Sequence, residues 1–164
     1  MILKFTPESQ DYLEATNEYI SIWNKEGDRI INEFKKVTGL DFIHKTINIV
    51  VYEGPSWSGK KDKPMKLRAS YDSDTKIATL IHELGHKLLV QLKNRIDGID
   101  EHMILNIFLY DIWINLYGEV FANKAVAIEK NRKGIYDYEK AWVWALSKSY
   151  NERQKILNQI KNLN

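Results

Sequence analysis

One segment constrains the fold more than any other, because it has the apolar spacing of a buried helix and carries the chemically most distinctive side chains of the chain. Apolar residues recur at helical spacing from Ile77 to Leu92, and Asp72-Ser73-Asp74 just before them predicts a helix cap. His82, Glu83 and His86 fall inside this helix. Residues four positions apart lie about 40° from each other around a helix, so both imidazoles project from one face and can bind one ion.

This grouping predicts a zinc site with hydrolytic chemistry. Zinc lowers the pKa of a water molecule from about 15.7 toward 7, and Glu83 is placed to act as the general base on that water. The alternative is a helix whose histidines are ordinary hydrogen-bonded polar residues. Gly85 argues for the metal site, because a glycine inside a helix costs about 1 kcal/mol relative to alanine. Close passage of another backbone at this turn would explain that cost.

A catalytic zinc ion needs a third protein ligand from elsewhere in the chain. Leu92 stands where the metzincin arrangement requires a third histidine, which excludes that subclass. Glu119 is favoured because Ala122 and Ala125 are small and permit a second helix to approach closely. The full set of candidates is His102, Asp111, Glu119 and Glu129.

The two segments together resemble a pair of motifs known from zinc peptidases. Residues 81–89 read IHELGHKLL, and residues 119–123 read EVFAN. This pair is similar to the HELGH and ExxAN or ExxAD motifs of gluzincins, a group that includes the small soluble minigluzincins and the ImmA/IrrE-type repressor-cleaving peptidases. The resemblance covers residues 46–130.

The resemblance implies a zincin-like fold and a zinc metalloendopeptidase with one catalytic Zn²⁺ ion. It implies that His82, His86 and Glu119 bind the ion and that Glu83 is the base. Asn123 stands where some relatives carry Asp, a place from which it can orient a ligand histidine. Residues 1–45 and 131–164 lie outside the resemblance.

A peptide substrate also needs alignment. Met65 to Tyr71 alternates apolar and polar residues and predicts a strand directly before the metal helix. At the edge of a sheet, this strand would pair with an extended peptide, with Lys66, Arg68 and Tyr71 as substrate contacts. An interior strand is the alternative. The oxyanion needs a donor besides zinc, and the candidates are His102, Tyr71, Tyr117 and Tyr136.

The first part of the chain predicts a helical region and a strand. Thr6-Pro7-Glu8 has the capping hydroxyl and early proline of a helix start. The helical region would end at Gly39, with a break at Gly27 as an open alternative. Thr46 to Tyr52 is short and β-branched and predicts a strand.

The second part predicts further helices. Asp97 or Asp100 caps a helix that runs to about Tyr117 and continues or restarts to Glu129. Gly134 stops it, and residues 137–163 predict one last amphipathic helix.

Together these segments predict an α+β fold, mostly helical with one small sheet. No long linker interrupts the 164 residues, so we expect one domain. It would comprise an N-terminal helical region (1–45), a catalytic core (46–130) and a C-terminal helix (135–164).

Composition excludes other classes of function. The chain has no cysteine, which rules out disulfides and thiolate metal sites and suits a cytoplasmic protein. A net charge of +2 is too small to indicate nucleic-acid binding. No apolar run reaches the roughly 20 residues of a membrane span. Residues 54–60 have the spacing of a phosphate-binding loop, but Lys61 stands where Ser or Thr is required.

The sequence thus predicts a soluble zinc metallopeptidase that acts on a peptide or protein substrate. The alternative is a regulatory or latent protein on a zincin scaffold that acts on one specific partner with little or no general proteolysis. In a latent form, the C-terminal helix would cover the cleft.

Overall fold

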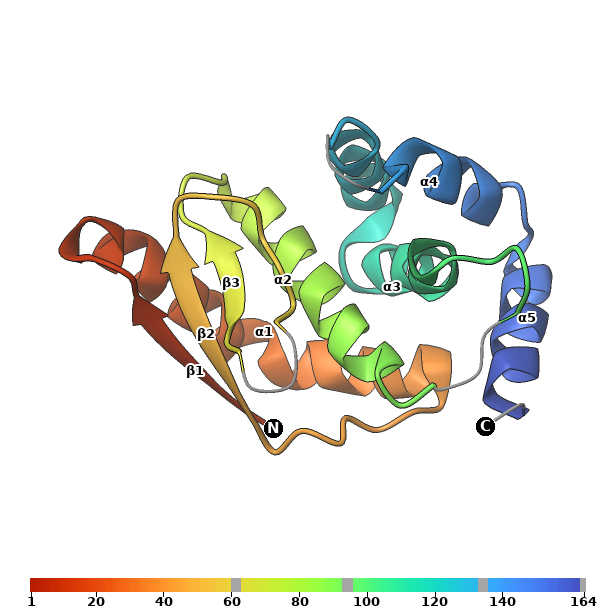
Figure 1. The fold of residues 1–164 in the computed structure, drawn as a ribbon, viewed down its shortest axis with the longest axis horizontal. Helices are drawn as coiled ribbons and strands as arrows, with labels where there is room; N and C mark the ends of the chain where they lie inside the picture. Colours follow the sequence, from red (N-terminus) through yellow and green to blue (C-terminus); the bar gives the residue numbers. More distant parts are fainter. Residues whose placement is uncertain (60–62, 93–95, 133–135, 163–164) are drawn as a thin grey trace. The chain divides into compact units, whose positions relative to one another are not determined.

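Three parallel strands and five α-helices make up an α+β fold in the computed structural model, which describes residues 1–59, 63–92, 96–132 and 136–162 (Figure 1). The chain divides into two units. Unit 1 contains residues 1–32 and 40–88, and unit 2 contains residues 33–39 and 89–164. Each unit is described by itself.

Unit 1 is built on a sheet with the strand order β1-β2-β3. The strands are β1 (Ile2–Pro7), β2 (Thr46–Tyr52) and β3 (Met65–Arg68), and both neighbouring pairs are parallel. The small sheet predicted from the sequence is therefore confirmed. Strand β2 has the predicted bounds, and β3 ends three residues earlier than predicted.

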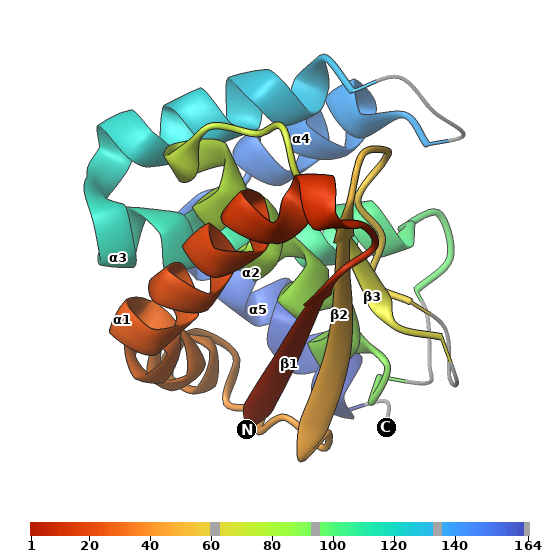
Figure 2. The same ribbon diagram turned by 90° about the vertical axis from the view of Figure 1, so that its left-hand side faces the viewer.

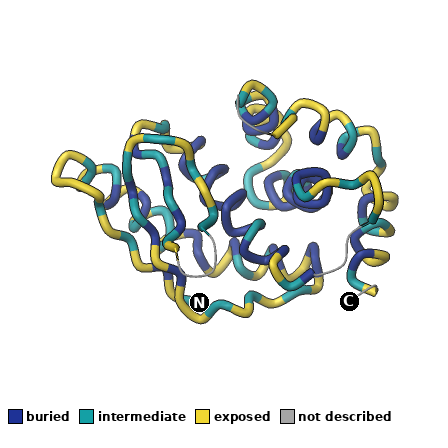
Figure 3. Tube along the Cα trace, in the orientation of Figure 1, coloured by how far each residue is buried: buried dark blue, intermediate teal, exposed yellow. Residues whose placement is uncertain are grey.

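One face of the sheet is buried and the other faces outward. On the central strand, Ile47, Ile49 and Val51 are at most 3% exposed, whereas Thr46 and Asn48 between them are exposed. Helices α1 (Leu13–Thr38) and α2 (Ser73–Leu89) lie beside the sheet (Figures 1 and 2). The alternation of buried and exposed positions along the strands is visible in Figure 3.

The prediction that the first helix starts at Thr6-Pro7-Glu8 is wrong. Residues 2–7 form β1, a 3-10 turn follows at Gln10–Tyr12, and α1 begins at Leu13. Proline restricts the residue before it to extended backbone and has no N–H to donate, so Pro7 suits the end of an edge strand. The pairing of Ile2 with Thr46 fixes β1 and joins segments more than 40 residues apart, which local propensity does not reveal.

Helix α1 continues through Gly27, so the alternative of a break there is wrong. A Cβ atom at Gly27 would lie 2.9 Å from the Trp23 ring, which shows that the glycine makes room for that ring within the helix. The predicted end at Gly39 is confirmed. Gly39 adopts φ 70° and its N–H donates to the Lys35 carbonyl at 2.8 Å.

Besides residues 33–39, unit 2 contains α3 (Glu101–Lys130), α4 (Tyr138–Leu146) and α5 (Tyr150–Asn162), with α4 and α5 packed on α3. The rings of Trp113 and Trp142 stack with their centroids 5.5 Å apart between α3 and α4. The guanidinium of Arg153 on α5 forms a buried ion pair with Asp111 on α3. Apolar and charged contacts therefore both join α3 to its neighbours.

Helix α3 is interrupted at Gly118, which has φ 85° and ψ 171°. Only glycine adopts this backbone conformation readily. The prediction of a helix that continues or restarts after Tyr117 is confirmed as a restart. Its predicted cap is confirmed as well, because Asp100 accepts a hydrogen bond from the Met103 N–H at 2.9 Å.

The prediction of a single last helix over residues 137–163 is wrong, because the structure has two. Helix α4 ends at Leu146, and Ser149 starts α5 with a reciprocal cap. The Ser149 N–H donates to the Glu152 carboxylate at 2.7 Å, and the Glu152 N–H donates to the Ser149 hydroxyl at 3.4 Å. This capping box competes with the continuous helical pattern and ends it. The predicted stop at Gly134 lies outside the described residues.

Within the described ranges, no helix is long and apolar enough to cross a membrane.

Candidate metal centre

The candidate site starts from α2, whose N-terminus is capped as predicted. The Asp72 carboxylate accepts a hydrogen bond from the Thr75 N–H at 2.7 Å. From Leu80 to Leu84 every residue is buried, so the helix places polar groups in an apolar environment. His82 is 1% exposed and Glu83 is 3% exposed. Imidazole and carboxylate groups that are buried among apolar residues need hydrogen-bond partners or a bound ligand.

His82 and His86 point their imidazoles at the same place. Their Nε2 atoms are 3.2 Å apart, and the two ring centroids are 4.9 Å apart. Two nitrogens bound to one tetrahedral zinc ion, each at 2.0–2.1 Å from it, lie about 3.3 Å from each other. The pair therefore has nearly the separation that a shared ion requires. Without an ion, one Nε2 has to donate a proton to the other.

Glu83 has a cationic neighbour one turn further along α2. Lys87 is 8% exposed, and its ammonium donates to the Gly59 carbonyl at 3.2 Å. Burial lowers the pKa of Lys87, while the negative charge of Glu83 acts in the opposite direction. Burial also lowers the pKa of His44, and the charge of Lys87 adds to this effect. Lys87 thus interacts electrostatically with both Glu83 and His44.

Lys87 also forms a hydrogen bond to the loop that leads to Gly59, the loop with the phosphate-binding spacing. Gly59 has φ 77°, and a Cβ atom there would lie 2.5 Å from the Lys63 carbonyl oxygen. Its own carbonyl faces α2 and accepts the bond from Lys87. The loop is therefore held to α2 through the backbone carbonyl of Gly59. Lys60 and Lys61 of the phosphate-loop spacing lie outside the described residues.

Two of the four candidates for the third ligand have other partners in unit 2. The Asp111 carboxylate is bound by Arg153, at 3.3 Å from its Nε atom. The Glu129 carboxylate accepts from the Trp142 indole N–H at 2.9 Å and lies 3.6 Å from Arg132. These carboxylates hold helices together, which leaves His102 and Glu119.

Both remaining candidates belong to α3, but their surroundings differ. His102 is 4% exposed and its ring contacts two tyrosine rings, with centroid distances of 4.5 Å to Tyr136 and 4.8 Å to Tyr138. His102 offers a third imidazole as a metal donor. Glu119 is exposed and directly follows the break at Gly118. Burial therefore favours His102, and the motif favours Glu119.

Asn123 lies one turn after Glu119 on α3. Its side-chain oxygen accepts a hydrogen bond from the Tyr110 hydroxyl at 3.1 Å. Burial raises the pKa of Tyr110, and the charge of Glu119 adds to this effect. Tyr110, Glu119 and Asn123 thus form one polar group on α3, which the sequence did not reveal because the three residues lie on two sides of the helix break.

Strand β3, the predicted substrate-binding strand, lies at the edge of the sheet. Residues 56–57 already form hydrogen bonds with the backbone on its outer side. Lys66 exchanges backbone hydrogen bonds with Trp57, at 2.8 and 2.9 Å, and the Arg68 N–H donates to the Ser56 hydroxyl at 3.1 Å. The side chains are paired as well, Lys66 with Glu8 and Arg68 with Glu53. A peptide would bind along β3 only if residues 56–57 moved away.

Sequence reasoning missed two lysines of α2. Lys76 and Lys87 are 4% and 8% exposed, and they stand seven positions before and four positions after Glu83. This spacing puts all three residues on one face of the helix. The sequence signal that could have revealed them is this stripe of three charged residues within an otherwise apolar helix. It indicates buried ion pairs or a functional site rather than a solvated face.

Comparison with models of known protein families, with curated proteins and with solved structures gives no significant match.

Proposed function

We propose that the chain is a zinc-dependent hydrolase that cleaves peptide bonds, with His82 and His86 as metal ligands and Glu83 as the general base. The observation that carries the proposal is the 3.2 Å separation of the two Nε2 atoms on a buried helix. The specificity for peptide bonds follows from the resemblance of the two motifs to gluzincins. A cytoplasmic location belongs to the same proposal and rests on the lack of cysteine.

The donor set fits zinc. Imidazole nitrogens are common zinc ligands, and the chain offers no thiolate that would favour a structural site with four cysteines. A bound zinc ion would supply a Lewis acid and make water nucleophilic at neutral pH. The residues of α2 would bind the ion and accept the proton. His82 and His86 would hold the ion by their Nε2 atoms, and Glu83 would accept a proton from the attacking water.

Lys87 supports Glu83 in this role. The ammonium of Lys87 is on the same face of α2, one turn after Glu83, and supplies a positive charge next to this buried carboxylate. Because the Gly59 carbonyl accepts a hydrogen bond from this ammonium, the lysine is fixed in position.

In this proposal the third ligand comes from α3. Glu119 completes the gluzincin motif, with Asn123 beside it as a positioning residue. His102 would then act as a proton donor or oxyanion contact. If His102 is the ligand instead, the site has three histidines, and the resemblance to gluzincins no longer supports peptide-bond specificity.

The test is a comparison of Glu83→Gln with the unchanged chain, both loaded with zinc. The substitution keeps the size of the side chain and removes the base. We expect an equal zinc content and a loss of hydrolysis of a fluorogenic casein substrate by at least about 100-fold. Glu139→Gln is the control, because Glu139 is an exposed carboxylate on α4 and its loss should leave hydrolysis unchanged.

Two outcomes contradict the proposal in different ways. Equal hydrolysis by Glu83→Gln and by the unchanged chain would remove Glu83 as the base. A zinc-loaded chain that cleaves neither casein nor a broad peptide library would instead favour a regulatory zinc protein.

A further inference from the structure

Helix α3 changes direction at Gly118, where the backbone leaves the helical conformation (Figure 2). Helical hydrogen bonds join residues four positions apart, so they do not fix the part after the break on the part before it. Glu119, the proposed third zinc ligand, directly follows the break and is exposed. Side-chain contacts that cross the break therefore decide how firmly Glu119 is held.

A hydrogen bond between two side chains crosses this break. The Tyr110 hydroxyl donates to Oδ1 of Asn123 at 3.1 Å, and the two residues stand eight positions before and five positions after Gly118. Asn123 follows Glu119 by four residues, so their side chains are neighbours on one face of the helix. Because the amide oxygen faces Tyr110, the amide NH₂ group faces away from it and can donate to the Glu119 carboxylate.

The ring of Tyr110 is itself held by α5. The Arg153 guanidinium lies 5.6 Å from the centre of this ring, within the range of a cation–π contact. That guanidinium forms the buried ion pair with Asp111 and donates to the Lys148 carbonyl at 2.6 Å. Tyr110 is therefore attached to a well-fixed part of unit 2.

The charge of Glu119 acts on Tyr110 as well. Burial raises the pKa of Tyr110, and the negative charge of Glu119 is the next largest cause that raises it. The hydroxyl therefore keeps its proton at neutral pH and remains a donor. The effect of Glu119 also indicates that its carboxylate lies near the Tyr110 side chain.

We propose that Tyr110 is a positioning residue whose hydroxyl, through the side chain of Asn123, holds Glu119 where it binds zinc. The inference rests on the proposed function for the role of Glu119 as a ligand. The attachment of residues 119–123 to Tyr110 does not depend on the metal. It gives α5 an indirect part in the metal site, because Arg153 holds the ring of Tyr110.

The first measurement is amide hydrogen exchange by NMR in the full-length, metal-free chain. Tyr110→Phe removes the hydroxyl and keeps the ring. We expect the amides of residues 123–126 to exchange about three- to tenfold faster, because one hydrogen bond is lost, and those of residues 103–109 to stay unchanged. Tyr150→Phe is the matched control, since Tyr150 is 54% exposed on α5.

The second measurement is the zinc Kd, obtained by competition with a chromophoric chelator. Tyr110→Phe should raise the Kd about three- to tenfold, and Tyr150→Phe should not change it. Asn123→Leu should raise the Kd at least as much. In the Asn123→Leu chain, the further change Tyr110→Phe should have no effect, because Tyr110 acts through Asn123. A tyrosine that only stabilised the fold would not show this dependence on Asn123.

An unchanged zinc Kd in Tyr110→Phe would overturn the proposal. Equal effects of Tyr110→Phe with and without Asn123→Leu would overturn it too, because Tyr110 would then act by another route. Either result leaves the proposed hydrolase intact if the unchanged chain binds zinc and cleaves casein. A chain that binds no zinc would instead remove the proposed function and the ligand role of Glu119, whereas faster exchange in Tyr110→Phe would still show the attachment to Tyr110.

Discussion

The Nε2 atoms of His82 and His86 lie 3.2 Å apart on consecutive turns of α2. Two unbound imidazoles have one weak hydrogen bond available at this distance, whereas a shared zinc ion would use both nitrogens fully. The backbone supplies this geometry, because it follows from the four-residue spacing within a continuous helix. The helix is in turn held by its Asp72 cap and by burial of its apolar face.

The third ligand is tested by zinc content. We expect Glu119→Ala to lose zinc and His102→Ala to retain it, because Glu119 completes the motif pair. Mass spectrometry under native conditions gives the metal content of each folded chain. Loss of zinc in His102→Ala alone would instead assign the ligand to the buried imidazole, and the resemblance to gluzincins would then no longer support the proposal.

The buried ion pair between Asp111 and Arg153 should be important for the stability of unit 2. Burial raises the pKa of Asp111, and the hydrogen bonds from Arg153 oppose this shift. Asp111→Asn would leave a buried guanidinium without its counter-charge, at a cost of about 3 kcal/mol in the free energy of unfolding. Urea denaturation measures the change.

The matched control is Glu8→Gln, which breaks the exposed pair between Glu8 and Lys66. Its side chains are 49% and 34% exposed, so the loss should stay below about 1 kcal/mol. Equal effects of the two substitutions would show that burial does not set the strength of the Asp111 pair.

Gly118 should be required for the break in α3. Nothing lies within 4 Å of a Cβ atom at this position, so Gly118→Ala meets no steric clash and its cost is conformational. Backbone with φ 85° and ψ 171° costs a non-glycine residue about 1–3 kcal/mol. Urea denaturation should show this loss. An unchanged stability with increased helicity by circular dichroism would mean that α3 straightens instead.

The cap of α5 should depend on pH. Hydrogen bonds from the Ser149 side chain, and then from its backbone, lower the pKa of Glu152 below its ordinary value of 4.5. The cap is therefore fully stabilising above about pH 4.5, and it weakens as the pH falls through the lowered pKa. Ser149→Ala should return the pKa of Glu152 toward its ordinary value in an NMR titration. An unchanged pKa in Ser149→Ala would show that the backbone bond alone sets it.

Local patterns predicted the parts of the fold that depend on neighbouring residues. The strand at Thr46–Tyr52, the cap at Asp100 and the end at Gly39 all follow from short-range chemistry. The strand at Ile2–Pro7 did not, since its partner is far away in the sequence. The division of the last helix was missed because the Ser149 and Glu152 cap was not recognised within an amphipathic pattern.

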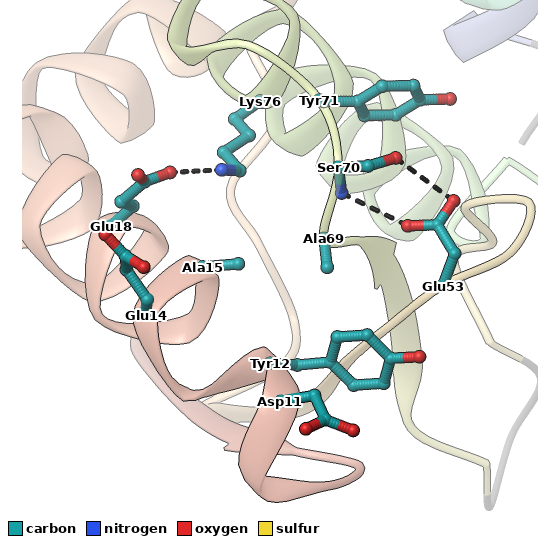
Figure 4. Close-up of a pocket in the computed structure, with 10 residues that line it drawn as sticks. All are labelled: Asp11, Tyr12, Glu14, Ala15, Glu18, Glu53, Ala69, Ser70, Tyr71 and Lys76. Atoms are coloured by element: carbon teal, nitrogen blue, oxygen red, sulfur yellow. Dashed lines mark hydrogen bonds and ion pairs between the residues drawn. The ribbon is translucent and has the colours of Figure 1, made fainter.

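For the site, helical spacing predicted that His82 and His86 point the same way. The partners of Asp111 and Glu129 could not be foreseen, because ion pairs and indole hydrogen bonds between helices depend on packing. The pairing of Trp57 with Lys66 likewise joins a loop to a strand and has no local signal. A pocket of unit 1 at the start of α2 is lined by residues of the 3-10 turn, α1, α2 and the segments after β2 and β3, so no single motif indicates it (Figure 4).

The central claim is that α2 binds a zinc ion through two histidines. Its most direct test is the zinc content of the purified chain, compared with His82→Ala and His86→Ala, after dialysis against zinc and removal of the excess. We predict one zinc ion per unchanged chain and almost none in either variant, with all three chains folded by circular dichroism. A folded, unchanged chain that retains no zinc, or variants that retain as much as it does, would contradict the account.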